Sequence, residues 1–168
     1  AKDRIIVDAM KSWENNVPVD IRSPEATRPW QHVLEPISGY LNLGMALSFN
    51  DTLHGEAFNF GPKSSRNHSV VDLIEDLSKT TKIFYESKAY KITDHRAFYE
   101  AGLLKLNCDK AMFHMNWEAT LNYEQTVEFT GRWYSDFYTN NKNMYDVTIK
   151  QIKDYEKHAN SQGMKWTV

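Results

Sequence analysis

Cysteine is nearly absent from this chain: Cys108 is the only cysteine among 168 residues. A single thiol cannot form an intrachain disulfide, and disulfide frameworks are typical of small secreted domains. Zinc sites combine cysteines and histidines at close spacing, and the six histidines show no HxxxH or HxH pattern. The sequence therefore predicts no metal site and a reducing, cytoplasmic location.

Glycine is also scarce, with seven residues and no GxGxxG or P-loop pattern. Those patterns place glycines where a backbone must approach a dinucleotide or a phosphate closely. A GxSxG nucleophile elbow is absent too. Tyr138 and Lys142 form a YxxxK pair like that of a dehydrogenase, but the asparagines between them are typical of a helix C-terminus and no nucleotide loop precedes them. We therefore predict no catalytic residue and no cofactor-binding residue in this chain.

Long apolar runs and an excess of either charge are missing as well. No apolar run approaches the roughly 20 residues that a membrane-spanning helix needs. Lys plus Arg is 20 against 22 acidic residues, which gives a net charge of −2. Such a balance provides no basic surface for a phosphate backbone. The sequence predicts neither a nucleic-acid partner nor a membrane partner.

The residues that are present indicate a mixed α/β chain. Apolar residues at 3.6-residue spacing predict helices over 4–15, 36–49, from 69 to at least 77, over 107–116, from 122 to at least 137, and over 144–160. Short β-like runs predict strands at 19–22, 30–34, 57–62 and 83–85, and residues 86–102 are expected to be irregular. This order of elements favours one compact domain with a helical C-terminal end.

Four helix starts carry a capping signal. Ser69 with Asp72 and Asn122 with Gln125 have the spacing of a capping box, in which each side chain bonds a backbone N–H at the other position. Asp3 has the position of an N-cap for the first helix, and Asn107 has that position for the helix that ends near residue 116. The chain enters the first helix at once after Ala1, without a methionine, which predicts that it is a piece of a longer protein.

Four motifs occur in a recognisable order: AKDRIIVDAMKSW, RPWQHVLEPISGYL, GEAFNFGP and EAGLLKLNCDKA. In this order they resemble the CDP-glucose 4,6-dehydratases, a family of extended short-chain dehydrogenases. Trp117 corresponds to the tryptophan of that family's Leu-Gly-Trp, with Asn116 in place of the glycine. The resemblance covers residues 1 to about 140 and only the C-terminal half of the family's pattern.

The resemblance implies an α/β substrate-binding portion that lacks the Rossmann half. Residues 1–140 would bind the nucleotide sugar and residues 141–168 would form a helical extension. The N-terminal half of the same protein would be the partner that binds NAD and carries the catalytic groups. The complete enzyme would convert CDP-glucose into CDP-4-keto-6-deoxyglucose and water, and this chain alone would be inactive and bind no NAD.

The resemblance also implies substrate contacts. Arg28 would grip the diphosphate with paired charge-assisted hydrogen bonds, although a surface ion pair with Glu25 or Glu35 would explain it too. Asn59 would donate an amide to a phosphate or bond local backbone. The remaining predicted contacts are Val19 and Ile21 against the base, Arg4 at the pocket entrance, and Glu100 on the ribose or the cytosine amine. Strand packing and solvated charge are the alternatives for the first three of these.

Two departures keep other functions open. Tyr99 replaces a histidine of the family pattern, which weakens the prediction of cytosine as the base, and Asn107 replaces an aspartate. The alternatives are a UDP- or dTDP-sugar epimerase or dehydratase of the same superfamily, and a non-catalytic nucleotide-sugar-binding module. Without a nucleotide-binding half, we expect the 58–60 strand and the helices of Ile5 and Ile37 to be partly uncovered. One result of that exposure would be a homo-oligomer.

Overall fold

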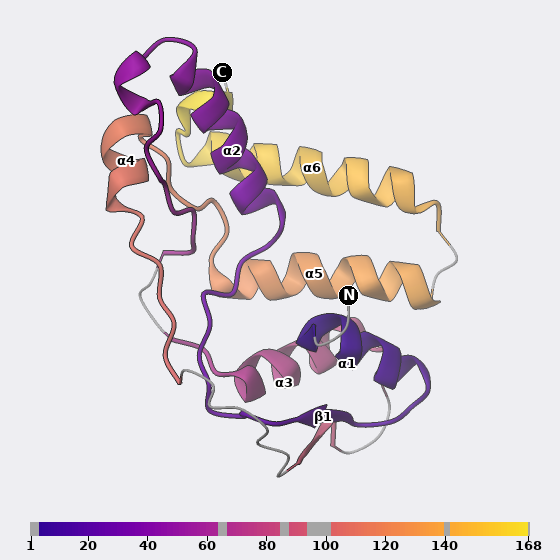
Figure 1. The fold of residues 1–168 in the computed structure, drawn as a ribbon. Helices are drawn as coiled ribbons and strands as arrows, with labels where there is room; N and C mark the ends of the chain where they lie inside the picture. The colour runs from indigo at the N-terminus through magenta and orange to yellow at the C-terminus, as the bar shows by residue number, and fades with distance from the viewer. Residues whose placement is uncertain (1–3, 64–66, 85–87, 94–101, 140–141, 168) are drawn as a thin grey trace. The chain divides into compact units, whose positions relative to one another are not determined.

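The computed structural model describes residues 4–63, 67–84, 88–93, 102–139 and 142–167. Figure 1 shows the elements along the chain. They are α1 (Ile5–Glu14), β1 (Val19–Ile21), α2 (Leu34–Leu47), η1 (Asp51–Leu53), α3 (Val70–Thr81), β2 (Tyr90–Ile92), α4 (Asp109–Met115), α5 (Tyr123–Thr139), α6 (Met144–Ser161) and η2 (Lys165–Thr167). All six predicted helices are confirmed, with ends shifted by a few residues.

The chain divides into two compact units, each built from three separate stretches. Unit 1 comprises residues 1–28, 66–104 and 127–148, and unit 2 comprises residues 29–65, 105–126 and 149–168. The boundaries fall inside α5 and α6, so each of these helices contributes to both units. The expected division at residue 140 remains a prediction.

Unit 1 contains a two-stranded parallel sheet beside a helical core. Strands β1 and β2 pair with Val19 opposite Tyr90 and Ile21 opposite Ile92. The core side of α1 buries Ala9, Met10 and Trp13. The indole N–H of Trp13 donates to the carbonyl of Ala89 at 2.8 Å, which ties this helix to the residue just before Tyr90.

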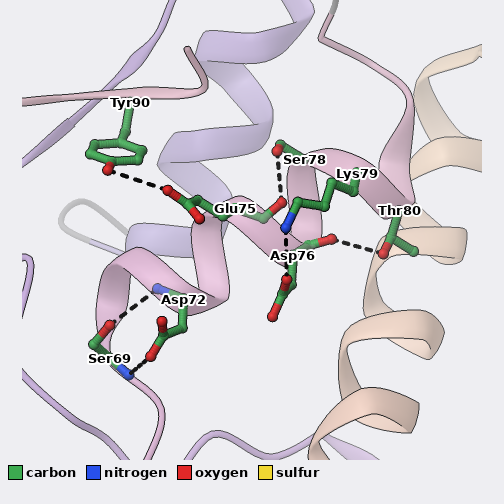
Figure 2. A network of polar contacts seen from close by, with 8 residues as sticks. All are labelled: Ser69, Asp72, Glu75, Asp76, Ser78, Lys79, Thr80 and Tyr90. Atoms are coloured by element: carbon green, nitrogen blue, oxygen red, sulfur yellow. Dashed lines mark hydrogen bonds and ion pairs between the residues drawn. The ribbon is translucent and has the colours of Figure 1, made fainter. Parts of the chain in front are cut away.

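Helix α3 of unit 1 begins as predicted. The Ser69 hydroxyl accepts a hydrogen bond from the N–H of Asp72 at 3.1 Å, and the Asp72 carboxylate accepts one from the N–H of Ser69 at 2.8 Å. Figure 2 shows this reciprocal pair at the start of the helix. Two backbone donors that the first turn cannot satisfy internally are thereby bonded. The capping box is confirmed, and the helix buries Leu73, Ile74 and Leu77.

Unit 2 has its own aromatic core. Phe60, Ala111, Trp117 and Ala119 form a buried cluster, with the Phe60 and Trp117 rings edge to face at 4.9 Å. Asn116 ends α4 with a positive φ of 52°, a conformation that asparagine tolerates better than most residues. The turn expected from the family's Leu-Gly-Trp is therefore kept with asparagine at the glycine position.

Three predicted strands are wrong over the residues that the structure describes. Residues 30–34 form no strand, because α2 already begins at Leu34. Residues 57–62 are irregular, and the Phe60 carbonyl accepts a hydrogen bond from the Gln31 side chain at 3.1 Å instead of pairing in a sheet. Residues 83–84 are buried but unpaired in a sheet, and residue 85 lies outside the described part.

Three further expectations need correction. Strand β2 lies within residues 86–102, which were expected to be irregular. The N-cap of α1 is Arg4, whose side chain makes no capping hydrogen bond, and Asp3 lies outside the described residues. The expected cap at Asn107 is displaced by one residue: Cys108 is the N-cap, while the Asn107 side chain accepts a hydrogen bond from the N–H of Asp109 at 3.0 Å.

Candidate functional site

Arg28, the predicted diphosphate ligand, lies at the end of the first stretch of unit 1. The preceding residue, Thr27, bridges to both Ser69 and Leu103, and its N–H donates to the carbonyl of Gly102 at 2.8 Å. The Arg28 side chain is half-buried, and its Nη1 donates to the Thr27 carbonyl at 2.8 Å. The backbone that carries this guanidinium is therefore held on two sides, which suits a residue that must present a charge in a fixed direction.

Asn59, the predicted phosphate donor, is exposed in unit 2. Its Nδ2 donates to the carbonyl of Asn107 at 3.2 Å. The acceptor is a backbone carbonyl 48 positions along the chain and not the local backbone expected as the alternative for this residue. The contact uses one of the two amide hydrogens, and the ligand role of Asn59 stays a prediction.

Val19 and Ile21, the predicted base contacts, are both buried in β1. Between them Asp20 is exposed, and its carboxylate pairs with the Lys91 ammonium at 3.2 Å. Side chains alternate across a strand, so Val19 and Ile21 lie on the core face and Asp20 on the opposite one. Their packing role is established in this structure, and a contact with a base stays a prediction.

The two charged residues predicted beside the nucleotide are placed differently. Arg4 is exposed at the start of α1. Glu100 lies outside the described residues, as do Asp3 and Tyr99. Arg4, Val19, Ile21 and Arg28 belong to unit 1 and Asn59 belongs to unit 2, so the predicted contacts are not gathered within either unit.

A buried polar cluster in unit 2 was not predicted from the sequence. It consists of Glu35, Ser38, Trp117, Thr120, Leu121 and Tyr155, and we call it the Glu35 cluster. The Glu35 carboxylate, 1% exposed, accepts hydrogen bonds from the N–H groups of Thr120 at 2.9 Å and Leu121 at 2.7 Å. The Tyr155 hydroxyl donates to the same carboxylate at 3.0 Å. A glutamate in the first turn of a helix is usually solvated, so nothing in the sequence signals this burial.

Burial shifts the ionisation of the titratable groups in this region. It raises the pKa of Glu35 above its ordinary value, while the three hydrogen bonds and the Lys63 charge act in the opposite direction. It also raises the pKa of the Tyr155 phenol, with Glu35 adding to the shift. Burial lowers the pKa of His32 to about 4. His32 is therefore neutral in the folded protein near pH 7.

A separate hollow of about 520 Å³ lies in unit 2 at the end of α6. It is lined by Lys153, Glu156, Lys157, Asn160, Trp166 and Thr167. None of these is among the predicted substrate contacts.

Within the described ranges, no group of three or more His, Cys, Asp or Glu side chains is placed to hold a metal ion. None of the helices described there has the length and apolar character needed to cross a bilayer.

Comparison with known proteins connects the chain to a known enzyme. No protein-family model matches it. The CDP-glucose 4,6-dehydratase of Salmonella typhimurium is 33% identical over 155 residues, which cover 92% of this chain and 42% of that enzyme. The chain is a homologue of the C-terminal part of CDP-glucose 4,6-dehydratase. It spans about two fifths of the length of this relative, and the predicted resemblance is confirmed.

The resemblance to CDP-glucose 4,6-dehydratases implies NAD, and three of the seven glycines of this chain are occupied by packing contacts that leave no room for its phosphates. A side-chain carbon added at Gly61 would lie 2.9 Å from Leu106, and one added at Gly131 would lie 2.7 Å from Thr80. Gly39 faces the Phe60 ring at still closer range. These glycines let protein segments pack closely and do not cradle a phosphate.

Proposed function

We propose that the chain is the substrate-binding part of an NAD-dependent nucleotide-sugar 4,6-dehydratase. The complete enzyme would convert CDP-glucose into CDP-4-keto-6-deoxyglucose and water, with NAD and the catalytic groups in a part outside this chain. The observation that carries the proposal is the similarity to CDP-glucose 4,6-dehydratase, which extends over 92% of this chain and 42% of that enzyme. Residues 1–140 would form the substrate-binding domain and residues 141–168 its extension.

Arg28 is the residue proposed to bind the substrate diphosphate. A guanidinium can give two parallel N–H donors to phosphate oxygens, and it keeps its charge at any pH near neutrality. The hydrogen bonds of Thr27 to its neighbours fix the backbone at this position, so less ordering is needed when the ligand binds. The other proposed substrate contacts are Asn59, Val19, Ile21, Arg4 and Glu100.

The exposed side of α2 supports an NAD-binding partner in the same protein. Six large apolar residues on this helix and at its two ends are exposed, and we call them the apolar face of α2: Val33, Ile37, Tyr40, Leu41, Met45 and Phe49. An apolar patch of this kind on one helix is typical of a surface that another protein layer covers. We propose that the part of the enzyme outside this chain is that layer.

Titration calorimetry on the complete enzyme tests the assignment of Arg28. Arg28→Ala should weaken the binding of CDP-glucose by about 1.5–3 kcal/mol, the range for hydrogen bonds to charged groups, which is about 10- to 150-fold in Kd. Arg132→Ala is the matched control, because Arg132 is an exposed arginine that pairs with Glu128 on α5. Equal affinities of the Arg28→Ala variant and the unmodified enzyme would contradict the assignment.

The same calorimetry decides the base, and a measurement of product formation separates an enzyme from a binding module. Tighter binding of CDP-glucose than of UDP-glucose and dTDP-glucose would support the cytosine assignment, and equal binding of all three would contradict it. Preference for UDP- or dTDP-glucose would favour a sister enzyme of the superfamily. Binding without release of water from the sugar, measured by formation of the 4-keto product, would favour a non-catalytic binding module.

A further inference from the structure

Helix α2 buries a charged residue and exposes large apolar ones, which is the reverse of an ordinary amphipathic helix. Its buried residues are a carboxylate and a glycine, Glu35 and Gly39, while its apolar face is exposed. Surface helices normally bury their apolar stripe and expose their charged residues. Leu43 of α2 packs partly buried against the aromatic core of unit 2, so hydrophobic burial contributes to the orientation of this helix. The full burial of Glu35 points to a second, polar interaction.

The Glu35 carboxylate supplies that interaction. Its Oε2 accepts from the Thr120 N–H and the Tyr155 hydroxyl, and its Oε1 accepts from the Leu121 N–H. These donors come from the turn before α5 and from α6, and all of them belong to unit 2. One side chain of α2 thus bonds two other segments of the chain through both of its oxygens.

Ser38, one turn further along α2, extends the contact. Its hydroxyl oxygen accepts a hydrogen bond from the indole N–H of Trp117 at 3.1 Å, and it also lies 3.0 Å from the hydroxyl oxygen of Tyr155, whose single hydrogen is donated to Glu35. Gln162, just past the end of α6, donates from its side chain to the Thr120 carbonyl at 2.8 Å. The buried side of α2 is therefore bonded to the same two segments at successive turns.

We propose that Glu35 is a positioning residue that holds the 120–121 turn and α6 on the polar side of α2, and thereby keeps the apolar face of α2 outward as a docking surface. Rotating the helix to bury that face would leave the two backbone N–H groups without their acceptor, at a cost that opposes the gain in apolar burial. Buried polar groups can select one arrangement in this way. The identity of the docked layer, the NAD-binding part, rests on the proposed function.

Hydrogen exchange followed by NMR on the 168-residue chain tests this role. In Glu35→Gln only one oxygen remains, so one of the Thr120 and Leu121 amides should keep its protection while the other exchanges about 10- to 100-fold faster. In Glu35→Ala both amides should exchange faster. The control is Glu124→Gln, the same change at an exposed carboxylate in the first turn of α5, which should leave both amides protected.

The pattern distinguishes positioning from a general loss of stability. Faster exchange at all amides alike, including those of α3, or no change at Thr120 and Leu121 in either variant, would overturn the proposal. Should Glu35→Gln fail to fold, Tyr155→Phe replaces it: loss of the hydroxyl should speed exchange around residue 155 about tenfold and leave Thr120 and Leu121 protected. Unchanged exchange around residue 155 would overturn the proposal. No nucleotide sugar enters this experiment, so its outcome is independent of that for Arg28.

Discussion

Helices α3 and α2 have similar lengths, but they bury opposite kinds of side chain. Helix α3 starts with a reciprocal capping box and buries Leu73, Ile74 and Leu77. Helix α2 has no side-chain cap at its start and buries Glu35 and Gly39. Local sequence signals therefore account for α3, whereas α2 depends on donors that are distant in the sequence. The comparison shows that an apolar stripe predicts where a helix is, but not which side of it faces the core.

The same truncation at one leucine of each helix gives the largest expected contrast. Leu77 on α3 is 0% exposed and Leu41 on α2 is 72% exposed. Leu77→Ala should lower the free energy of unfolding by about 2–5 kcal/mol, because it removes buried apolar contacts and leaves a cavity. Leu41→Ala should change it by less than about 0.5 kcal/mol. Urea denaturation measures both, and equal losses would show that the apolar face of α2 is covered within the chain.

His32, just before α2, should make the free energy of unfolding depend on pH. Burial lowers its pKa from 6.5 to about 4 in the folded protein, and its Nδ1 accepts a hydrogen bond from the Leu34 N–H at 3.4 Å. The unfolded chain takes up this proton first as the pH falls, so His32 should cost up to about 3 kcal/mol of stability between about pH 6.5 and pH 4. Glu35 acts in the opposite direction, since a raised carboxyl pKa contributes stability that is lost as the pH rises.

The variant His32→Gln isolates the histidine effect from that of Glu35. Its stability, followed by urea denaturation at several pH values, should fall less steeply than that of the unmodified chain over this range. His54→Gln is the control, because the His54 side chain is largely exposed. A slope that His32→Gln leaves unchanged would assign the pH dependence to other groups.

The start of α3 gives the smallest expected effect. Ser69→Ala removes the hydroxyl that accepts from the Asp72 N–H and should lower the free energy of unfolding by about 1 kcal/mol. Ser48→Ala, at the exposed C-terminal end of α2, is the matched control and should have an effect within about 0.5 kcal/mol. Thermal denaturation of the two variants compares them directly. A larger loss of stability in Ser48→Ala than in Ser69→Ala would contradict this prediction.

The helices could be predicted because their signals are local. The Ser69–Asp72 and Asn122–Gln125 boxes each lie within four residues, and both are formed as expected. Strands need partners that are distant along the chain. Residues 57–62 have an apolar alternation like that of a strand, but the Phe60 carbonyl is bonded by the Gln31 side chain. Strand β2 was missed because its pairing with β1 joins Val19 to Tyr90 and leaves no signal near either.

The residues of the candidate site also differ in whether local sequence could predict their roles. Arg28 was identified through the resemblance to a family, and its guanidinium alone would equally suit a surface ion pair. Glu35 stands in the same motif, but its burial depends on Thr120, Leu121 and Tyr155, which lie far along the sequence. Nothing in the residues next to Glu35 indicates those donors. A sequence motif can therefore suggest which charged residue binds a ligand, but it does not indicate which charged residue is buried.

The alternation of the two units along the chain has a consequence for synthesis. The chain passes from one unit to the other after residues 28, 65, 104, 126 and 148. Unit 1 lacks its last stretch until residue 148 has been made. Unit 2 lacks Tyr155, which bonds Glu35, until most of α6 has been made. A growing chain on the ribosome must therefore hold both partly built cores until nearly the whole sequence has emerged. For the same reason, no single cut in the gene would release either unit intact.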